Sequence, residues 1–564
     1  MRIRPRLLAL LFLAGIAVLV AEPALAAETR NLASQVDAVF SPYAKPGSPG
    51  CALAVIQDGR IAYEKGYGLA SLEQGVPITP QTVFDIGSTS KQFTAASVLL
   101  LAQEGKLSLD DDVHKYIPEL PDYGTPVTLR HLLHHTSGIR DYINLMVFGG
   151  INVEDWTTDD DALAVLARQK KLDFKPGDEH SYSNSGYFLL SLVVKRASGK
   201  PLRQLAQERI FGPLGMTSTR YLDDHTEVVP RRAASYAPGE GGRFKVQTAN
   251  WEQTGDGAVQ TTVEDLAKWD QNFYTPKVGG SWLVEQLQTT GTLNSGEAIT
   301  YARGLVVSRF RGLRRVAHGG AWAGYRAQLM RFPDQRFSVV TLCNLASSNP
   351  TLLAQQVAEI YLAGQLQTAT PPPVPAKTTT AGPAGDLARY AGTFWGPATD
   401  TVHRVVARDG KLFLSRRSGE DYELVPAGEG RFEIRLPGSD PVVLLFPPAA
   451  TGAPRELRIT APGEPTDVYR EVQTVTLKPE ELAAYAGTYT SEELDATWTI
   501  QAAAGHLVVR GKRGPSAPLE SAFADAFLGP AGLMRFARDG QGKVTGFLVG
   551  AGRARDLRFI RAGS

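Results

Sequence analysis

The last third of the chain repeats itself at a constant spacing, and this repeat limits the possible folds more than any other feature. Three landmarks recur at an offset of 95 residues: YAGTF at 390–394 with YAGTY at 485–489, Gly410 and Leu412 with Gly505 and Leu507, and Phe432 with Phe527. Each copy is a run of short alternating strands separated by Gly, Asp and Pro turns. We therefore predict two copies of a small antiparallel barrel or sandwich, at 385–474 and 475–564.

A segment rich in proline and threonine separates these repeats from the rest of the chain. It covers residues 367–384 and reads QTATPPPVPAKTTTAGPA. Proline stiffens its first half, which is typical of a linker. We therefore predict a separate domain at 27–366, and the 43% hydrophobic content of the 564 residues is sufficient for several cores.

The N-terminus has the pattern of an export signal. Arginines at positions 2, 4 and 6 precede an apolar run at 7–20, and Ala-Leu-Ala at 24–26 fits a small-x-small cleavage site. The run is short for a membrane span. We predict a signal peptide at 1–26 and a periplasmic or secreted mature protein. An uncleaved anchor is the alternative, and only that alternative implies contact with a membrane.

The net charge of +1 gives no electrostatic reason to expect nucleic acid as a partner. The expected partner is a small-molecule or peptide substrate, and the sequence leaves the oligomeric state open. No cofactor is expected. The histidines at 131, 134 and 135 lack the glutamate of a HExxH site, so no metal is expected either.

Strand patterns stand at both ends of the region 50–366, with helical patterns between them. Because strands from both ends have to pair, this order predicts an antiparallel sheet flanked by helices, with an all-helical insertion and a cleft between insertion and sheet. The expected strands are 51–56, 61–63, 304–310, 314–318, 325–332 and 337–343, and the clearest helices are 159–166 and 187–197. A long helix is expected after Ser88, and a last helix at about 350–366.

Ser88 and Lys91 form the first of three motifs that carry chemistry. Three residues apart at the start of a helix, a hydroxyl and an amine lie on one face and within reach of each other. A serine nucleophile needs a nearby base, and a lysine shielded from water is driven toward its neutral form. The start of a helix also favours developing negative charge.

Tyr182 and Asn184 belong to the second motif, and His318, Gly319 and Gly320 form the third. Tyrosine, with a pKa near ~10, becomes a base only where an ammonium stabilises its phenolate. The sequence leaves open whether Lys91 or Tyr182 takes the serine proton. We expect Asn184 to hold Lys91 or the substrate amide by hydrogen bonds.

The order of the three motifs resembles the serine penicillin-recognising hydrolases, in the branch of class C β-lactamases, DD-peptidases, D-aminopeptidases and esterases. Five connecting phrases match as well: TLRHLLHHTSG at 128–138, PGD at 176–178, YFLL at 187–190, PLGM at 213–216 and GAV at 257–259. The resemblance covers about residues 30–365, and the two repeats resemble the lipocalin-like barrels that follow the catalytic domain of D-aminopeptidases. It implies an α/β fold of the β-lactamase/transpeptidase type followed by two small all-β domains.

The resemblance also implies roles for single residues. Ser88 is the nucleophile that forms an acyl-enzyme, and the backbone N–H groups of Ser88 and Ala321 form the oxyanion hole. Gly319 and Gly320 keep a strand edge bare for an extended substrate. The β-lactamases of this branch have lysine where this chain has His318. Because histidine is mostly neutral at pH 7, a peptidase or esterase is favoured over a dedicated β-lactamase.

We therefore expect an exported serine hydrolase that acts on peptides or amides containing D-amino acids, by D-aminopeptidase or DD-peptidase activity. A carboxylesterase or a weak class C-like β-lactamase is the alternative enzyme. A penicillin-binding sensor or an interaction protein without turnover is the alternative of another class. For the repeats, a structural role stays open beside a role in covering the cleft, narrowing its entrance or holding a partner.

Cys51 and Cys343 are the two cysteines, and both lie in apolar runs typical of strands. Such cysteines behave as small hydrophobic residues, so we expect buried free thiols. A disulfide is the alternative, because an exported protein permits one. The sheet order implied by the resemblance would also make the two strands neighbours.

Overall fold

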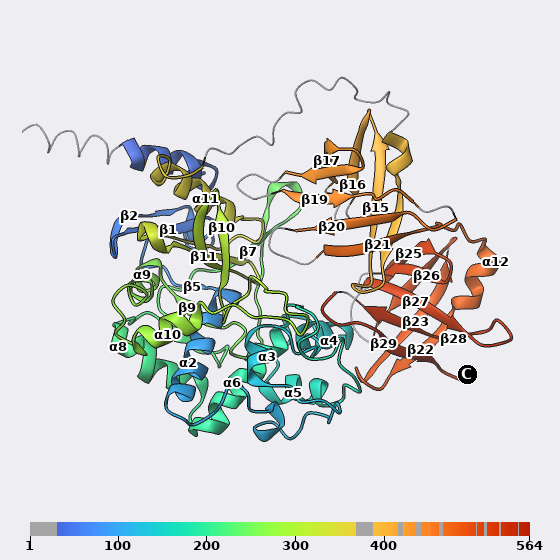
Figure 1. The fold of residues 1–564 in the computed structure, drawn as a ribbon, viewed down its shortest axis with the longest axis horizontal. Helices are drawn as coiled ribbons and strands as arrows, with labels where there is room; N and C mark the ends of the chain where they lie inside the picture. Colours follow the sequence, from blue (N-terminus) through green and yellow to red (C-terminus); the bar gives the residue numbers. More distant parts are fainter. Residues whose placement is uncertain are drawn as a thin grey trace, which may run out of the picture.

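The computed structural model describes residues 31–367 and 387–563, apart from the short segments 416–420, 436–440, 450–451, 462–465, 504, 512–515, 530–531 and 551. The expected signal peptide and nearly all of the expected linker lie outside the described residues. Figure 1 shows a first domain of mixed helices and strands, coloured blue to yellow, beside two β-barrels coloured orange and red. The predicted α/β domain followed by two small all-β domains is therefore confirmed.

A six-stranded sheet in the order β10-β11-β12-β13-β1-β2 forms the centre of the first domain. Its strands come from both ends of the domain, as the sequence predicts: β1 (Cys51–Gln57), β2 (Arg60–Tyr67), β10 (Val306–Phe310), β11 (Leu313–Trp322), β12 (Tyr325–Phe332) and β13 (Phe337–Cys343). Every pairing between these strands is antiparallel. β11 extends to Trp322, beyond the predicted end at 318, because Gly319 and Gly320 pair through their backbone with β12.

Helices cover both faces of this sheet. The side chains of β1, which point alternately to the two faces, show which helices cover each one. Leu53 and Val55 pack in one hydrophobic cluster with the helix at 31–40 and with α11 (Pro350–Tyr361). Ala52 and Ala54 face the other cluster, which contains the helical insertion. α11 ends at Tyr361 rather than 366. The insertion contains α2 (Lys91–Gln103), α3 (Leu129–Leu133), α4 (Tyr142–Phe148), α5 (Asp159–Ala167), α6 (Asn184–Ser198), α7 (Leu202–Ala206), α8 (Gly212–Leu214), α9 (Val263–Gln271) and α10 (Gly280–Leu287). It is not entirely helical as expected, because it also contains the short strands β6 (Arg220–Tyr221), β7 (Tyr236–Pro238), β8 (Phe244–Val246) and β9 (Val259–Thr261).

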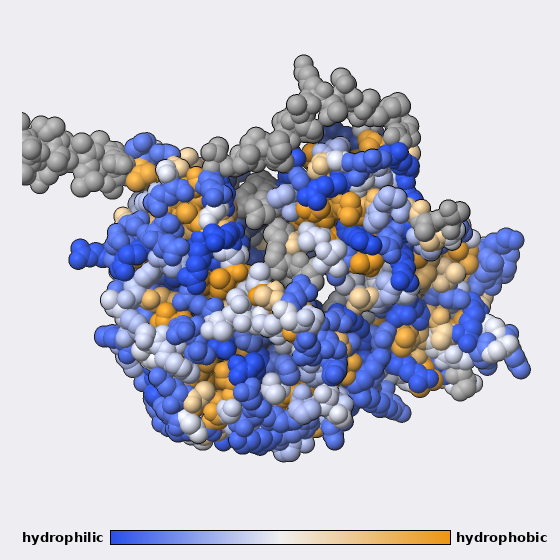
Figure 2. All heavy atoms as spheres, in the orientation of Figure 1, coloured by the Kyte–Doolittle hydropathy of each residue, from blue (hydrophilic) through white to orange (hydrophobic). Residues whose placement is uncertain are grey.

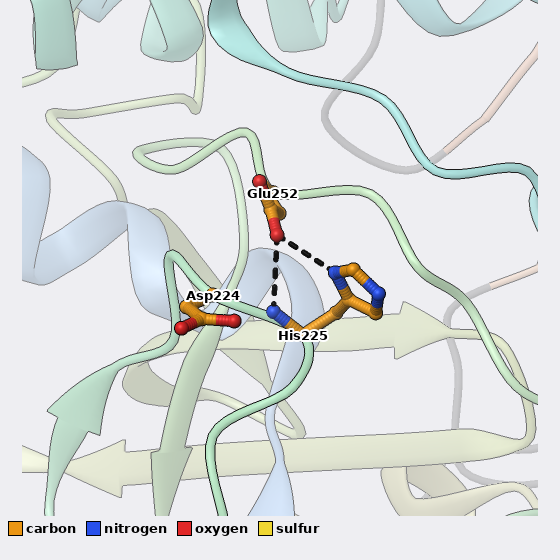
Figure 3. Close-up of side chains that lie close together, drawn as sticks. All are labelled: Asp224, His225 and Glu252. Atoms are coloured by element: carbon orange, nitrogen blue, oxygen red, sulfur yellow. Dashed lines mark hydrogen bonds and ion pairs between the residues drawn. The ribbon is translucent and has the colours of Figure 1, made fainter.

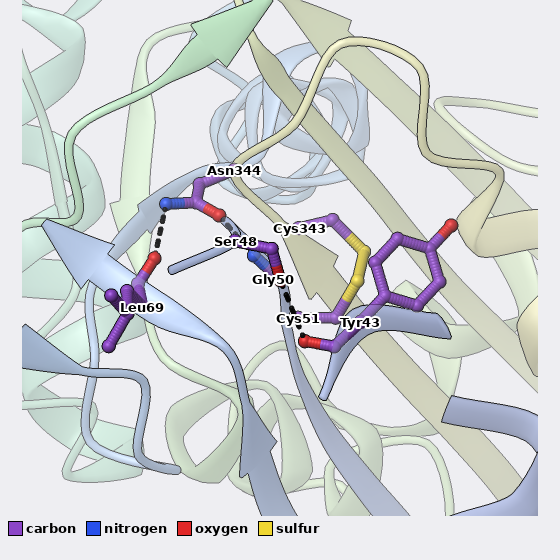
Figure 4. The surroundings of a disulfide bond; sticks show 7 residues. All are labelled: Tyr43, Ser48, Gly50, Cys51, Leu69, Cys343 and Asn344. Atoms are coloured by element: carbon purple, nitrogen blue, oxygen red, sulfur yellow. Dashed lines mark hydrogen bonds between the residues drawn. A yellow bond between two sulfur atoms is a disulfide. The ribbon is translucent and has the colours of Figure 1, made fainter. Parts of the chain in front are cut away.

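The two cysteines form a disulfide, so the expectation of free thiols is wrong (Figure 4). Cys51 and Cys343 are directly opposite each other on the neighbouring antiparallel strands β1 and β13, and both are fully buried. Opposite residues of such strands have their Cβ atoms close enough for a disulfide. The bond closes a sequence separation of 292 residues between the two ends of the domain.

The two repeats fold into two closed eight-stranded barrels, and their landmarks occupy equivalent places. Phe432 and Phe527 are both buried, and Gly410 and Gly505 both have positive φ in the turn after the second strand. The first barrel contains β14 (Gly392–Gly396), β15 (Thr401–Arg408), β16 (Lys411–Ser415), β17 (Asp421–Gly428), β18 (Arg431–Ile434), β19 (Val442–Leu445), β20 (Glu456–Thr460) and β21 (Thr466–Val472). The second contains β22 (Gly487–Ser491), β23 (Ala496–Ala503), β24 (His506–Arg510), β25 (Ala517–Phe523), β26 (Ala526–Gly529), β27 (Gly532–Arg538), β28 (Val544–Gly550) and β29 (Leu557–Arg561).

The second barrel shares its core with the first domain, whereas the first barrel has a core of its own. The indole N–H of Trp498, on β23, donates to the carbonyl of Phe148 at the end of α4 at 3.2 Å. The first barrel joins the second through Trp395 and Val402, which pack against a buried cluster of Ala522, Ala526 and Leu533. The face drawn in Figure 2 is mostly hydrophilic, with hydrophobic residues in separate patches. Among the described helices, none has the length and apolar character needed to cross a membrane.

Candidate active site

A cavity of about 1090 Å³ lies between the end of β11 and the helical insertion, where the sequence predicts a cleft. Seven of the eight predicted site residues line it: Ser88, Tyr182, Asn184, His318, Gly319, Gly320 and Ala321. Lys91 is fully buried behind Ser88. Three segments far apart in the sequence therefore meet in one place.

Ser88 and Lys91 are held together by the start of α2. Ser88 lies in a 3₁₀ turn, Gly87–Ser90, that runs directly into the helix. The Lys91 ammonium donates to the Ser88 hydroxyl at 3.1 Å, to Asn184 Oδ1 at 2.9 Å and to the carbonyl oxygen of Asp256 at 2.7 Å. An ammonium has three N–H donors, so these acceptors use all of them. Lys91 has to release one proton before it can act as a base.

Asn184, the first residue of α6, is fixed by the buried carboxylate of Asp141. Its backbone N–H and its side-chain amide both donate to Asp141 Oδ2, at 2.7 and 2.9 Å. This leaves Asn184 Oδ1 as the acceptor for Lys91. Asp141 also caps α4 by accepting from the N–H of Asn144. The position of the lysine therefore depends on a carboxylate that the sequence analysis did not identify.

Tyr182 lies beside Lys91, with the ring centre 4.9 Å from the ammonium nitrogen. Its ring packs against His135 at 4.2 Å between centres, and the backbone N–H of Ser183 donates to His135 Nδ1. The Tyr182 hydroxyl is buried and, among the described residues, has no hydrogen-bond partner. A phenol that is oriented by its neighbours but not bonded to them is available to a substrate.

The end of β11 presents a free backbone edge to the cavity. β10 pairs with β11 only as far as Ala317, so residues 318–322 are paired on one side, with β12. The chain before Ser88 passes close to this edge. A Cβ on Gly87, whose φ is +47°, would lie 2.7 Å from the backbone nitrogen of Ala321, and a Cβ on Gly320 would lie 1.9 Å from the carbonyl oxygen of Ile86. Both positions therefore need glycine.

Both ring nitrogens of His318 are bonded to the protein. Nδ1 donates to the carbonyl oxygen of Gly319 at 2.6 Å, and Nε2 accepts from the hydroxyl of Tyr301 at 3.0 Å. Burial, helped by the nearby charge of Lys91, lowers the pKa of His318 to about 4. The ring is therefore neutral at pH 7 and has no N–H left for a substrate in this arrangement.

Two buried carboxyl groups also line the cavity. Burial raises the pKa of Asp256 to about 7 and that of Asp85 to about 6. The Tyr142 hydroxyl donates to the Asp256 carboxylate, at 3.2 Å from Oδ2. The adjacent Asp256 carbonyl holds Lys91, so this loop links the lysine to a titrating acid. Asp256 precedes the GAV phrase, and that position was the one sequence signal for it.

Arg553 and Trp251 are lining residues that the sequence analysis did not identify. Arg553 comes from the second barrel and places its guanidinium carbon 4.8 Å from the centre of the Tyr182 ring. Trp251 meets Trp322 with 5.8 Å between ring centres, which makes Trp322 part of an aromatic wall. No local motif marks Arg553, because its role depends on how two domains dock.

Asp224, His225 and Glu252 form the group in the described residues that best fits metal-ligand spacing (Figure 3). Hydrogen bonds within the protein account for this cluster. Glu252 accepts from the ring of His225 at 2.7 Å, and Asp224 accepts from the backbone N–H of Thr226 at 2.8 Å. Asp224 is exposed, so the cluster carries no metal assignment.

Comparison with known proteins gives a consistent result. The model of the beta-lactamase family matches residues 36–363. A D-aminopeptidase of Gluconobacter oxydans is 29% identical over 92% of this chain and 96% of its own length. Penicillin-binding protein 4* of Bacillus subtilis is 30% identical over 67% of this chain and 86% of its own length. The similarity to the D-aminopeptidase therefore extends beyond the first domain and into both barrels.

A solved structure has a similar fold over much of the chain. The octameric penicillin-binding protein homologue from Pyrococcus abyssi aligns with a TM-score of 0.55 at 25% identity, over 78% of this chain and 99% of its own.

Proposed function

The chain belongs to the beta-lactamase family and is a serine hydrolase, and on that premise we propose that Ser88 forms an acyl-enzyme with peptides or amides that contain D-amino acids. The contact that carries this proposal is the 3.1 Å hydrogen bond between Lys91 Nζ and Ser88 Oγ. It places the nucleophile beside an amine that has no contact with bulk water.

In the first half of the reaction, Lys91 or Tyr182 takes the hydroxyl proton, and Ser88 Oγ attacks the amide carbon. The negative charge on the carbonyl oxygen is stabilised by the backbone N–H groups of Ser88 and Ala321. The C–N bond then breaks, and Tyr182 returns the proton to the leaving nitrogen. In the second half, water attacks the acyl-enzyme ester, and its proton passes back to Ser88.

The substrate class rests on the relatives and on the free strand edge. Relatives named D-aminopeptidase match the chain from the first domain to the second barrel. The unpaired edge at 318–322 suits an extended peptide, which can add its own backbone hydrogen bonds there. Neutral His318 does not supply the cation that lysine supplies at this position in the β-lactamases of this branch, which favours this proposal over a β-lactamase.

Purified Ser88→Ala protein tests the nucleophile. The variant is expected to keep its unfolding temperature and to lose turnover and labelling by an acylating probe, while the exposed-serine control Ser295→Ala keeps both. Retained turnover would exclude Ser88. Labelling of the unaltered protein without turnover would favour a penicillin-binding sensor.

A hydrolysis panel tests the substrate class. D-alanyl amides and D-Ala-D-Ala are expected to be cleaved faster, by kcat/KM, than short-chain esters and a chromogenic cephalosporin. Faster ester cleavage would favour the carboxylesterase, and faster cephalosporin cleavage the β-lactamase.

Export is part of the same proposal. The buried disulfide supports it, since such bonds persist mainly outside the reducing cytosol. The mature protein is expected to begin at Ala27, which mass determination of the protein recovered from the producing cells checks.

A further inference from the structure

We propose that Arg553 of the second barrel binds the carboxylate of the amino acid that leaves when the acyl-enzyme forms. This inference rests on the proposed roles of Ser88 and Tyr182. It assigns a substrate feature, a free carboxylate one residue after the scissile bond, to a side chain outside the family-matched domain.

Arg553 lies on the loop between β28 and β29, and this loop reaches the cavity that Ser88 lines. Its guanidinium carbon is 4.8 Å from the centre of the Tyr182 ring. The guanidinium therefore lies beside the phenol that protonates the leaving nitrogen in the proposed reaction.

The backbone of this loop is held firmly against the first domain. The N–H of Asp141 donates to the carbonyl oxygen of Arg553 at 2.8 Å, and the N–H of Arg555 donates to Asp173 Oδ1 at 3.0 Å. Between them, Ala554 is fully buried. Asp141 is the same residue that fixes Asn184, so the loop and the lysine share one support.

The side chain of Arg553, in contrast, is exposed and has no carboxylate partner among the described residues. Its neighbour Arg555 is paired with Glu179 at 3.0 Å, and Arg140 is paired with Asp173 and Glu493. An unpaired arginine at a substrate cavity offers a planar fork that binds a carboxylate through two parallel hydrogen bonds.

The charges around the cavity favour an anionic ligand. Three arginines line it, Arg232, Arg326 and Arg553, and Lys91 lies just behind it. The two lining carboxyl groups are buried, and burial raises the pKa of each toward neutrality. The cavity therefore carries an excess of positive charge at neutral pH.

Connectivity in the substrate identifies which carboxylate fits. In a leaving α-amino acid, the nitrogen and the carboxylate are attached to the same α-carbon. When Tyr182 reaches the nitrogen, the carboxylate is therefore close to the Tyr182 ring, where the guanidinium lies. A carboxylate farther along a peptide, or on the acyl side of the scissile bond, is not held close to the leaving nitrogen in this way.

Paired substrates test this assignment. D-Ala-D-Ala and its C-terminal amide differ only in the carboxylate. Arg553→Gln is expected to lower kcat/KM for the acid about 10- to 100-fold, mainly through KM, and to lower that for the amide much less. For the acid, the kcat/KM of Arg553→Lys should lie between those of the unaltered protein and Arg553→Gln. The exposed Arg558 of β29 supplies the control, and Arg558→Gln should behave like the unaltered protein. Equal losses on both substrates would overturn the assignment.

Binding without turnover separates this inference from the proposed function. Calorimetric titration of Ser88→Ala with the same two ligands is expected to show tighter binding of the acid, and Ser88→Ala/Arg553→Gln should lose that preference. Tighter binding of the acid than of the amide by Ser88→Ala would support the carboxylate site even if the unaltered protein cleaved neither ligand. Equal binding of acid and amide, or no binding of the acid, would overturn the site even if both were cleaved.

Discussion

The guanidinium of Arg140 donates a hydrogen bond to the carboxylate of Glu493 at 2.9 Å, so a fully buried arginine of the first domain is paired with a residue of the second barrel. The next residue, Asp141, fixes Asn184, and Asn184 holds Lys91. The docking of the barrel and the position of the lysine are therefore connected by adjacent residues.

Glu493→Ala is expected to destabilise the protein by roughly 3 kcal/mol, because it removes one partner of a buried charge. The value of kcat/KM should fall as well, because Asp141, the next residue after Arg140, fixes Asn184 and through it Lys91. Chemical denaturation and kcat/KM measure the two effects. The neighbouring Glu492 pairs with Lys170 at the exposed surface, so Glu492→Ala should change neither. An equal effect of the two substitutions would contradict the coupling.

Asn184→Ala is expected to lower kcat about 100-fold with little change in KM, because Lys91 loses the acceptor that orients it. The rate of acylation by a chromogenic ester measures this directly. A large rise in KM at constant kcat would instead mean that Asn184 mainly binds substrate.

Gly320→Ala is expected to abolish activity, because the added Cβ would lie 1.9 Å from the carbonyl oxygen of Ile86 and push β11 away from the turn that carries Ser88. The open, exposed Gly364 provides the control, and Gly364→Ala should keep full activity. The two variants are compared by labelling with an acylating probe. An active Gly320→Ala protein would show that this close approach is not needed.

The raised pKa of Asp256 predicts that the stability of the protein falls as the pH rises. Its pKa is raised from an ordinary 3.8 to about 7, so the folded protein binds more protons here than the unfolded chain between those values. Its ionisation therefore costs stability as the pH rises from 4 to 7. Between pH 4 and 7, the free energy of unfolding of Asp256→Asn should rise on the order of 3 kcal/mol relative to that of the unaltered protein. Urea unfolding at each pH tests this, with the exposed Glu154→Gln as a parallel control.

Removing the disulfide is expected to lower stability by about 2–4 kcal/mol and to leave kcat/KM unchanged, because neither Cys51 nor Cys343 lines the cavity. Thermal unfolding with and without a reductant measures the loss. The Cys51→Ser/Cys343→Ser protein should match the reduced protein and should not respond to reductant. A changed kcat/KM would connect the far end of the sheet to the site.

Local patterns predicted much of this architecture. The apolar runs at 325–332 and 337–343 match β12 and β13 residue for residue, and the spacing of Ser88 and Lys91 placed a hydroxyl beside an amine. These features depend on neighbours within one turn or one strand. The repeat at 95 residues likewise required only comparison of the chain with itself.

Features that depend on contacts between distant segments could not be predicted in this way. The pairing of Cys51 with Cys343 depends on the register of two strands 292 residues apart. The saturated hydrogen bonding of His318 depends on Tyr301, and the place of Arg553 depends on the docking of a barrel. Periodicity and spacing carry no information about such contacts.

Because Arg553 lies on the loop before the final strand of the second barrel, the substrate cavity is incomplete until almost all of the described chain has been synthesised and folded. A nascent chain whose last barrel has not yet docked would contain Ser88 and Lys91 without this wall. With the role proposed for Arg553, selectivity is acquired last, and a truncated product would retain Ser88 and Lys91 without it.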